Sequence, residues 1–230
     1  MNPKLEKLRQ ILPVEALMIG VCLMGMEMLL FRSGVDAHGL IRPDSSVGTV
    51  LAVASVLAVA VFALSAWKVE GTIGIPMPAF APKTTRISAI GIGFLSYDAV
   101  VDGGDPISYV AAFIGAVAAV SLLAGVFAAK LRRPSYTLTS LFFAIHCVLR
   151  YRMSSADPQL HDYVFPLLAE IVLMLCFFYY AAAGREEDNL RLRNFWRCCG
   201  IALCCGAIIR GGAAFVCQLP FLLIMNGDET

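Results

Sequence analysis

Charged side chains are scarce in this chain of 230 residues, since Asp, Glu, Lys and Arg together make up 15% of it. A soluble domain usually carries about 25%. No basic run interleaved with aromatic residues occurs, and the formal net charge is only +1, so nucleic acid is not an expected partner. GxSxG, HExxH and Walker motifs are also absent, and we therefore expect no catalytic residues from these classes of enzyme.

No CxxC pair and no Cys/His ligand spacing occurs among the eight cysteines. All of them lie in apolar runs, and four belong to "CCGIALCC" (198–205). Thiols in such runs usually behave as small buried hydrophobes. Palmitoylation or metal binding at this cluster is the alternative. The pattern is not a secreted disulfide framework, and we expect no metal and no cofactor.

Long apolar runs are what the sequence has in abundance, because 59% of the residues are hydrophobic. A helix needs about 20 apolar residues to cross a bilayer core, and several runs reach this length. We predict a single domain, residues 1–230, that is all-α: a polytopic transmembrane helical bundle surrounded by lipid. The expected helices are 13–31, 47–67, 87–102, 107–129, 136–153, 160–183, 195–209 and 213–226.

Three local patterns refine this picture. Pro13 is expected in the first turn of the first helix, where a missing N–H is harmless. Ala111, Gly115 and Ala119 form a small-xxx-small seam that would let helices approach closely. The last apolar stretch, 195–226, would place Arg210 near the middle of one overlong helix, and "RGG" (210–212) offers a break. We therefore expect eight helices, with seven and a buried Arg210 as the alternative.

The distribution of Lys and Arg predicts the orientation, since cytoplasmic loops of membrane proteins are enriched in these residues. If the N-terminus is cytoplasmic, the basic residues on the outer side are Arg32, Arg42, Arg150, Arg152 and Arg210. The others of the 18 basic residues then fall on the inner side. We expect a cytoplasmic N-terminus.

Polar residues within the expected helices fall into the outer half of the membrane in this orientation. The candidate substrate-binding residues are Glu27, Tyr97, Asp98, His146, Arg150, Asp162, Glu170 and Arg210. An ionised group at this depth normally faces the protein interior and finds a partner. Arg150 could pair with Asp162 or Glu170, and Arg210 could pair with Glu27 or Asp98.

The segment "YRMSSADPQLHDYVFPLLAEIVLML" (151–175), followed by a basic loop and a glycine-broken terminal hairpin, resembles a group of uncharacterised bacterial multi-pass membrane proteins. The resemblance implies a location in the bacterial inner (plasma) membrane. It carries no function with it.

Two classes of function fit this sequence. The first is a transport or solute-recognition protein, in which the outer polar residues line an outward-facing pocket for a small molecule or ion. The second is a non-catalytic sensor, scaffold or assembly partner whose charges are structural. A weaker third option is an intramembrane enzyme that uses His146 and Glu170 as an acid–base pair. The short chain favours a homo-oligomer or a subunit of a larger complex.

Overall fold

The computed structural model describes residues 3–33, 46–68, 81–154, 161–183 and 190–224. These residues form the helices α1 (Pro3–Ser33), α2 (Ser46–Lys68), α3 (Pro82–Gly103), α4 (Pro106–Phe127), α5 (Arg132–Ser154), α6 (His161–Ala182), α7 (Leu190–Gly211) and α8 (Ala213–Ile224), with a short 3-10 helix at Ala129–Leu131. The predicted all-α class is confirmed. Eight α-helices, rather than the alternative seven, occur in the described part of the chain.

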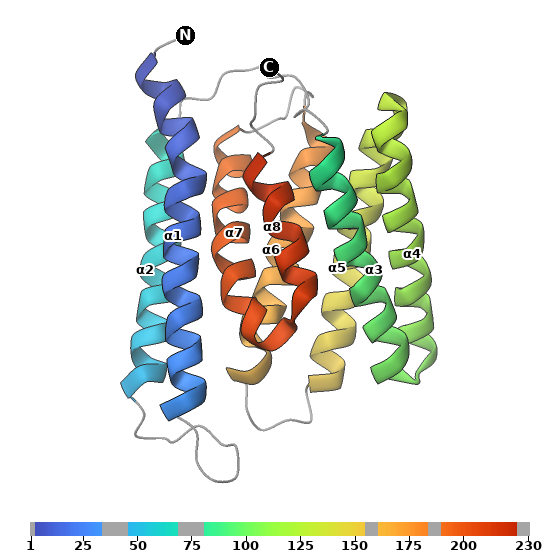
Figure 1. Cartoon of the computed structure of the whole chain (residues 1–230), viewed down its shortest axis with the longest axis horizontal. Coiled ribbons are helices and arrows are strands. Elements are labelled where there is room, and N and C mark those ends of the chain that lie inside the picture. The colour runs from blue at the N-terminus through green and yellow to red at the C-terminus, as the bar shows by residue number, and fades with distance from the viewer. Residues whose placement is uncertain (1–2, 34–45, 69–80, 155–160, 184–189, 225–230) are drawn as a thin grey trace.

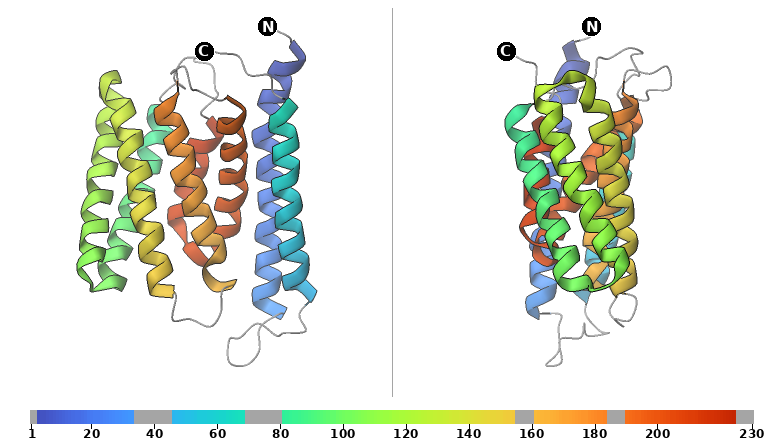
Figure 2. Two further views of the ribbon diagram at one scale, coloured as in Figure 1. Left: turned by 180° about the vertical axis from the view of Figure 1, so that it is seen from behind. Right: turned by 90° about the vertical axis from the view of Figure 1, so that its right-hand side faces the viewer.

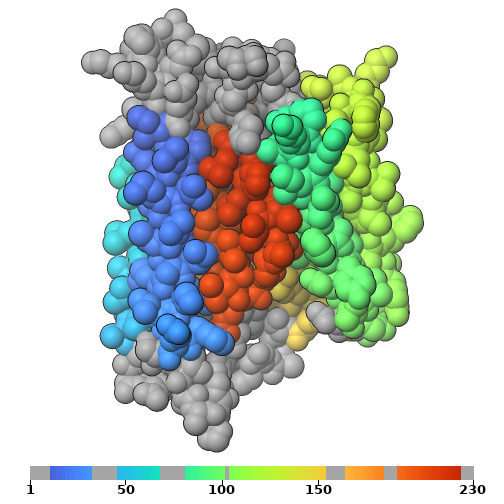
Figure 3. Space-filling view, in the orientation of Figure 1, coloured from blue at the N-terminus to red at the C-terminus, as the bar shows by residue number. Residues whose placement is uncertain are grey.

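The helices lie side by side with their axes roughly parallel or antiparallel (Figure 1). Helices α1 and α2 form one side of the molecule, and α3, α4 and α5 form the other (Figures 1 and 2). Between them, α7 packs against α1, α2, α6 and α8, while α6 packs against α5. The short α8 reaches α3 and fills the front surface between α1 and α3 (Figure 3). Helix α8 ends at the same end of the molecule at which α1 begins (Figure 1).

Four helices begin earlier than the sequence analysis predicted. Helices α1, α3, α5 and α7 start at Pro3, Pro82, Arg132 and Leu190, against predicted starts of 13, 87, 136 and 195. The physical reason is that an apolar run marks only the part of a helix that suits a membrane. Polar residues before that run continue the helix, because Lys, Glu, Gln and Arg are good helix formers. Pro13 consequently lies inside α1 and not in its first turn.

The predicted break after Arg210 is confirmed. Gly212 has a φ of +70°, a left-handed conformation that glycine adopts without a steric penalty. Its N–H donates to the Ile208 carbonyl at 3.0 Å and so closes the end of α7. Pairing of this kind satisfies carbonyls that the helix end would leave free. The chain then reverses into α8.

Within the described residues, five helices are long and apolar enough to cross a membrane, namely α1 from Ile11, α2, α4, α6 from Val164 and α7 from Arg191. Helices α3 and α5 are not among them. Both carry polar side chains on their buried faces, namely Thr84, Thr85, Ser88 and Ser96 on α3 and Ser135, Thr139, Ser140 and His146 on α5. These two helices therefore bring most of the polar character of the interior.

Small residues let α4 pack closely on its neighbours. Ala111 and Gly115 are buried as the predicted seam requires, whereas Ala119 is only half-buried and Ala118 takes the interior position. A Cβ atom on Gly115 would lie 2.0 Å from Ser96 Oγ and 2.6 Å from the Phe142 ring. The glycine is therefore needed where α3, α4 and α5 meet.

Three arginines close the carboxyl ends of helices at the end of the molecule where α1 begins. Arg132 Nε donates to the Gly125 carbonyl of α4 at 3.4 Å, and Arg133 Nη2 donates to the Ala183 carbonyl, which follows α6, at 3.3 Å. The buried Arg197 donates to the Leu222 and Leu223 carbonyls of α8. These carbonyls lack partners within their helices, and a cation also suits the negative end of the helix dipole.

Candidate functional site

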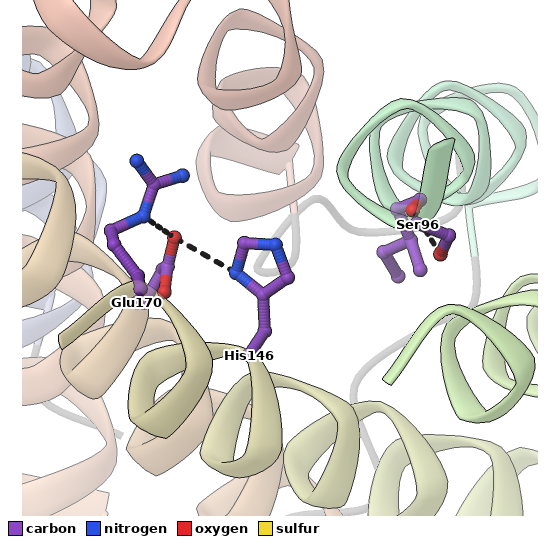
Figure 4. Close-up of polar contacts among 5 residues, drawn as sticks. Ser96, His146 and Glu170 are labelled. Atoms are coloured by element: carbon purple, nitrogen blue, oxygen red, sulfur yellow. Dashed lines mark hydrogen bonds and ion pairs between the residues drawn. The ribbon is translucent and has the colours of Figure 1, made fainter. Parts of the chain in front are cut away.

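Helices α5 and α6 bring three of the candidate residues together. His146 and Arg150 are four residues apart on α5, so they share one face of that helix. Glu170 faces them from the antiparallel α6. Its Oε1 atom lies 2.6 Å from Arg150 Nε and 3.1 Å from His146 Nδ1. Figure 4 labels Glu170 and His146 and draws these contacts as dashed lines. We call these three residues the α5–α6 cluster.

The α5–α6 cluster is buried most deeply at its carboxylate. The side chain of Glu170 is 0% exposed, that of His146 is 6% exposed and that of Arg150 is 23% exposed. Arg150 is therefore the most exposed member of the cluster. Because Arg150 and Glu170 carry opposite charges, their contact offsets much of the penalty for removing each from water.

Both oxygens of Glu170 are buried, yet only one of them is used. Oε1 takes both contacts, whereas Oε2 has no hydrogen-bond partner among the described residues. Arg150 likewise donates its hydrogen bond to Glu170 through Nε. Its Nη1 and Nη2 atoms have no hydrogen-bond partner among the described residues. A carboxylate oxygen buried without a donor is unfavourable. The cluster thus retains unused acceptor and donor capacity in a buried position.

His146 occupies the middle of this arrangement. Its ring lies between Glu170 of α6 and Ser96 of α3 (Figure 4). The Phe142 ring packs against it at a centroid distance of 5.4 Å. Ser96 Oγ donates to the Ile92 carbonyl at 2.7 Å, so its oxygen lone pairs stay available. The polar contacts of the cluster thus join α5 and α6, and Ser96 of α3 lies on the other side of the ring (Figure 4).

A second polar pair joins α1 to the end of α7. Arg210 Nε lies 3.4 Å from Glu27 Oε1, and Glu27 is 1% exposed. The Arg210 guanidinium also sits over the Phe31 ring at 4.9 Å, a cation–π contact. Among the described side chains, Arg150 pairs with Glu170 and Arg210 pairs with Glu27, as two of the expected pairings require.

The other predicted site residues do not join these pairs in the described structure. Tyr97 and Asp98 are exposed on α3, which corrects the expectation that they face a common interior. The buried face of α3 carries Ile92, Ser96 and Ala99, and the helical period turns Tyr97 and Asp98 away from it. The side chain of Asp162 lies outside the described residues.

Gln218 and Arg197 are two of the buried polar residues that the sequence did not single out. Gln218 is 0% exposed; it accepts a hydrogen bond from Ser88 Oγ at 2.6 Å and donates to the Ser88 carbonyl at 3.2 Å, so it joins α8 to α3. A lone amide in the apolar stretch 213–224 was the signal for it. Arg197 was counted only as an inner positive charge, and no local pattern indicated that it caps α8.

The four cysteines of the cluster 198–205 lie in the interior. Cys198, Cys199, Cys204 and Cys205 are buried and unoxidised on α7. Within the described residues, no three His, Cys, Asp or Glu side chains gather as metal ligands. Comparison with protein families, with curated proteins and with solved structures finds no match for this chain. Its function must therefore be argued from its own residues.

Proposed function

We propose that this chain is an integral membrane protein. The distribution of polarity supports this, because large hydrophobic side chains such as Val56, Phe113 and Phe127 are exposed while Glu27 and Glu170 are buried. A soluble protein rarely exposes so much contiguous apolar surface. In lipid the same arrangement is favourable, since ionisable groups then face the interior and find partners.

The same proposal gives the protein a cytoplasmic N-terminus and a place in the inner (plasma) membrane of a bacterium. The orientation rests on the excess of Lys and Arg on the side where α1 begins. The bacterial location rests on the sequence resemblance alone. Surrounding lipid is the expected environment, and a homo-oligomer or partner subunit is expected from the small size of the chain.

Within the membrane, we assign the protein a role in recognition or transport of a small polar solute at the α5–α6 cluster. The observation that carries this assignment is Glu170, whose side chain is fully buried while Oε2 has no hydrogen-bond partner among the described residues. A purely structural ion pair is stabilised by satisfying both carboxylate oxygens. An unused acceptor beside a partly exposed arginine is instead suited to a ligand.

A non-catalytic scaffold or assembly partner is the second candidate. The two interhelical pairs Arg150–Glu170 and Arg210–Glu27 favour it, since each is compensated within the chain and could simply hold helices together. The two functions differ in one measurable respect. Only a recognition protein has a ligand whose binding depends on the α5–α6 cluster.

Thermal unfolding in lipid nanodiscs tests the assignment. The purified chain is screened against amino acids, sugars, organic acids and organic cations. A ligand at roughly 100 times its Kd adds about 2.7 kcal/mol, which raises Tm by about 5–10 °C for a chain of this size. We expect at least one compound to do so, and we expect Glu170→Gln and Arg150→Ala to abolish the response.

Two control variants make the screen decisive. Glu27→Gln removes the other buried carboxylate, and Arg152→Ala removes an exposed partner of Asp105 (3.2 Å) two residues beyond Arg150. Both should keep the ligand response. A screen in which no compound raises Tm, combined with a stable protein partner on purification, would establish the scaffold role instead.

A further inference from the structure

The contact of the His146 ring with Glu170 favours one placement of its hydrogen. Nδ1 lies 3.1 Å from Glu170 Oε1; the two are close enough for an ion pair, although the ring is not turned for an aligned hydrogen bond. Two lone pairs at this distance would repel each other. A hydrogen on Nδ1 removes the repulsion and makes the contact with the carboxylate attractive, and the partner of one ring nitrogen sets the state of the other. Nε2 therefore holds the free lone pair of the neutral ring.

We propose that His146 Nε2 is a proton-binding atom of the site, and that a proton and an anionic group of the solute are bound together. This inference rests on the proposed function. Glu170 acts as a positioning residue that orients the ring through Nδ1. The step is a simple addition: the proton bonds to the Nε2 lone pair, and the same bond breaks on release.

Charged and titratable groups near His146 come from several of the helices packed around it. On the Nδ1 side, Glu170 contributes a negative charge. The positively charged Arg150 contacts the same carboxylate oxygen of Glu170. From α5 itself, Cys147 is half-buried next to His146. Helix α4 has no Asp, Glu, Lys, Arg or His between Pro106 and Phe127. On α3, Ser96 lies on the side of the ring opposite Glu170 (Figure 4), and Asp98 is exposed.

Protonation changes the net charge of the α5–α6 cluster from neutral to positive. An uncompensated positive charge in a buried position is unfavourable. An anionic oxygen group removes this penalty, and Arg150 has the nitrogens to hold it. With Nε used by Glu170, the Nη1 and Nη2 atoms present the fork that matches a carboxylate. The side chain of Arg150, 23% exposed, is also the member that a solute reaches first.

Solid-state NMR of the protein in lipid tests the proton half. The chain has three histidines, so ¹⁵N-labelled histidine gives few signals, and His146→Gln identifies the one that matters. At high pH we expect the His146 signal to report a hydrogen on Nδ1, and at low pH an imidazolium. In Glu170→Gln the preference for Nδ1 should disappear. A hydrogen on Nε2 in the unaltered protein, or no protonation while the other histidines titrate, would overturn the proposal.

Thermal shifts with small carboxylates such as acetate and pyruvate test the anion half. If one proton binds with the anion, the carboxylate concentration for half-maximal shift rises about tenfold per pH unit once His146 is mostly neutral. His146→Gln should remove this pH dependence, whereas Arg152→Ala should keep it. A response to neutral or cationic compounds alone, or one independent of pH, overturns this inference while leaving the proposed function in place. No response to any compound overturns the proposed function.

Discussion

At the residue scale, the molecule depends on which side chains are buried together. Glu170 would be strongly disfavoured in the interior by itself, and it is tolerated because Arg150 lies 2.6 Å away on the next helix. Loss of one member of such a pair is worse than loss of both, because it leaves an unpaired buried charge. The identity of the charges matters less than their complementarity.

Exchanging the charges of Arg150 and Glu170 tests whether their contact stabilises the fold. Arg150→Glu places two carboxylates side by side and should lower the free energy of unfolding by about 3–5 kcal/mol, with a matching loss of folded protein in the membrane. Combining it with Glu170→Arg should restore most of the yield, as measured by fluorescence-detected size exclusion. A double variant no better than Arg150→Glu would show that the contact does not stabilise the fold.

At the element scale, polar and small residues decide how the helices pack. Ser140 Oγ of α5 donates to the Met174 carbonyl of α6 at 2.9 Å, and Ser135 Oγ donates to the Ser121 carbonyl of α4 at 2.6 Å. Such bonds hold neighbouring helices in register, and in the proposed membrane environment they act where lipid gives no hydrophobic driving force for helix association. Gly115 acts in the same place by letting α3 and α5 approach α4.

Substitution of Gly115 should therefore disturb both packing and site. In Gly115→Ala the new methyl group would overlap the buried Phe142 ring, which also contacts His146. Overpacking of this kind lowers stability by about 1–3 kcal/mol. We expect a lower Tm in lipid and a weaker response to any ligand of the α5–α6 cluster.

Gly93→Ala is the matched control, because a Cβ at Gly93 of α3 meets no atom within 4 Å. It should leave stability unchanged or raise it by about 0.5–1 kcal/mol, since alanine favours a helix over glycine. Equal Tm values for the two variants would contradict the close packing at Gly115.

At the scale of the whole molecule, the two ends differ in chemistry. The end where α1 begins carries arginines that close α4, α6 and α8. Toward the opposite end lie the α5–α6 cluster and the Glu27–Arg210 pair, near the carboxyl ends of α5, α1 and α7. This asymmetry agrees with the proposed orientation, in which the capped end faces the cytoplasm.

Reporter fusions test this arrangement. Helix α8 ends where α1 begins (Figure 1), so reporters attached before Met1 and after Thr230 should both lie in the cytoplasm. We expect green fluorescent protein to fluoresce and alkaline phosphatase to be inactive at both positions. A chain truncated after residue 42 and fused to alkaline phosphatase should be active. Opposite results at the two ends would contradict an even number of crossings.

The sequence by itself determined the elements and their class. Long apolar runs predict helices because the information is local, and the same locality placed the break at Gly212 and the shared face of His146 and Arg150. It also predicted that the buried acids need basic partners, since this follows from the energy of a single charge in an apolar environment. The helix starts were wrong where polar residues extend a helix beyond its apolar run.

Only the tertiary structure decided which partners meet. Glu27 and Arg210 are separated by 183 positions, and no periodicity indicates that α1 and α7 are neighbours. Asp98 was an equally good partner for Arg210 in sequence, but the rotation of α3 about its axis leaves it exposed. The unused Oε2 of Glu170 was also beyond prediction, because hydrogen-bond satisfaction depends on every helix that surrounds an atom. Pattern along a chain is local, whereas packing is not.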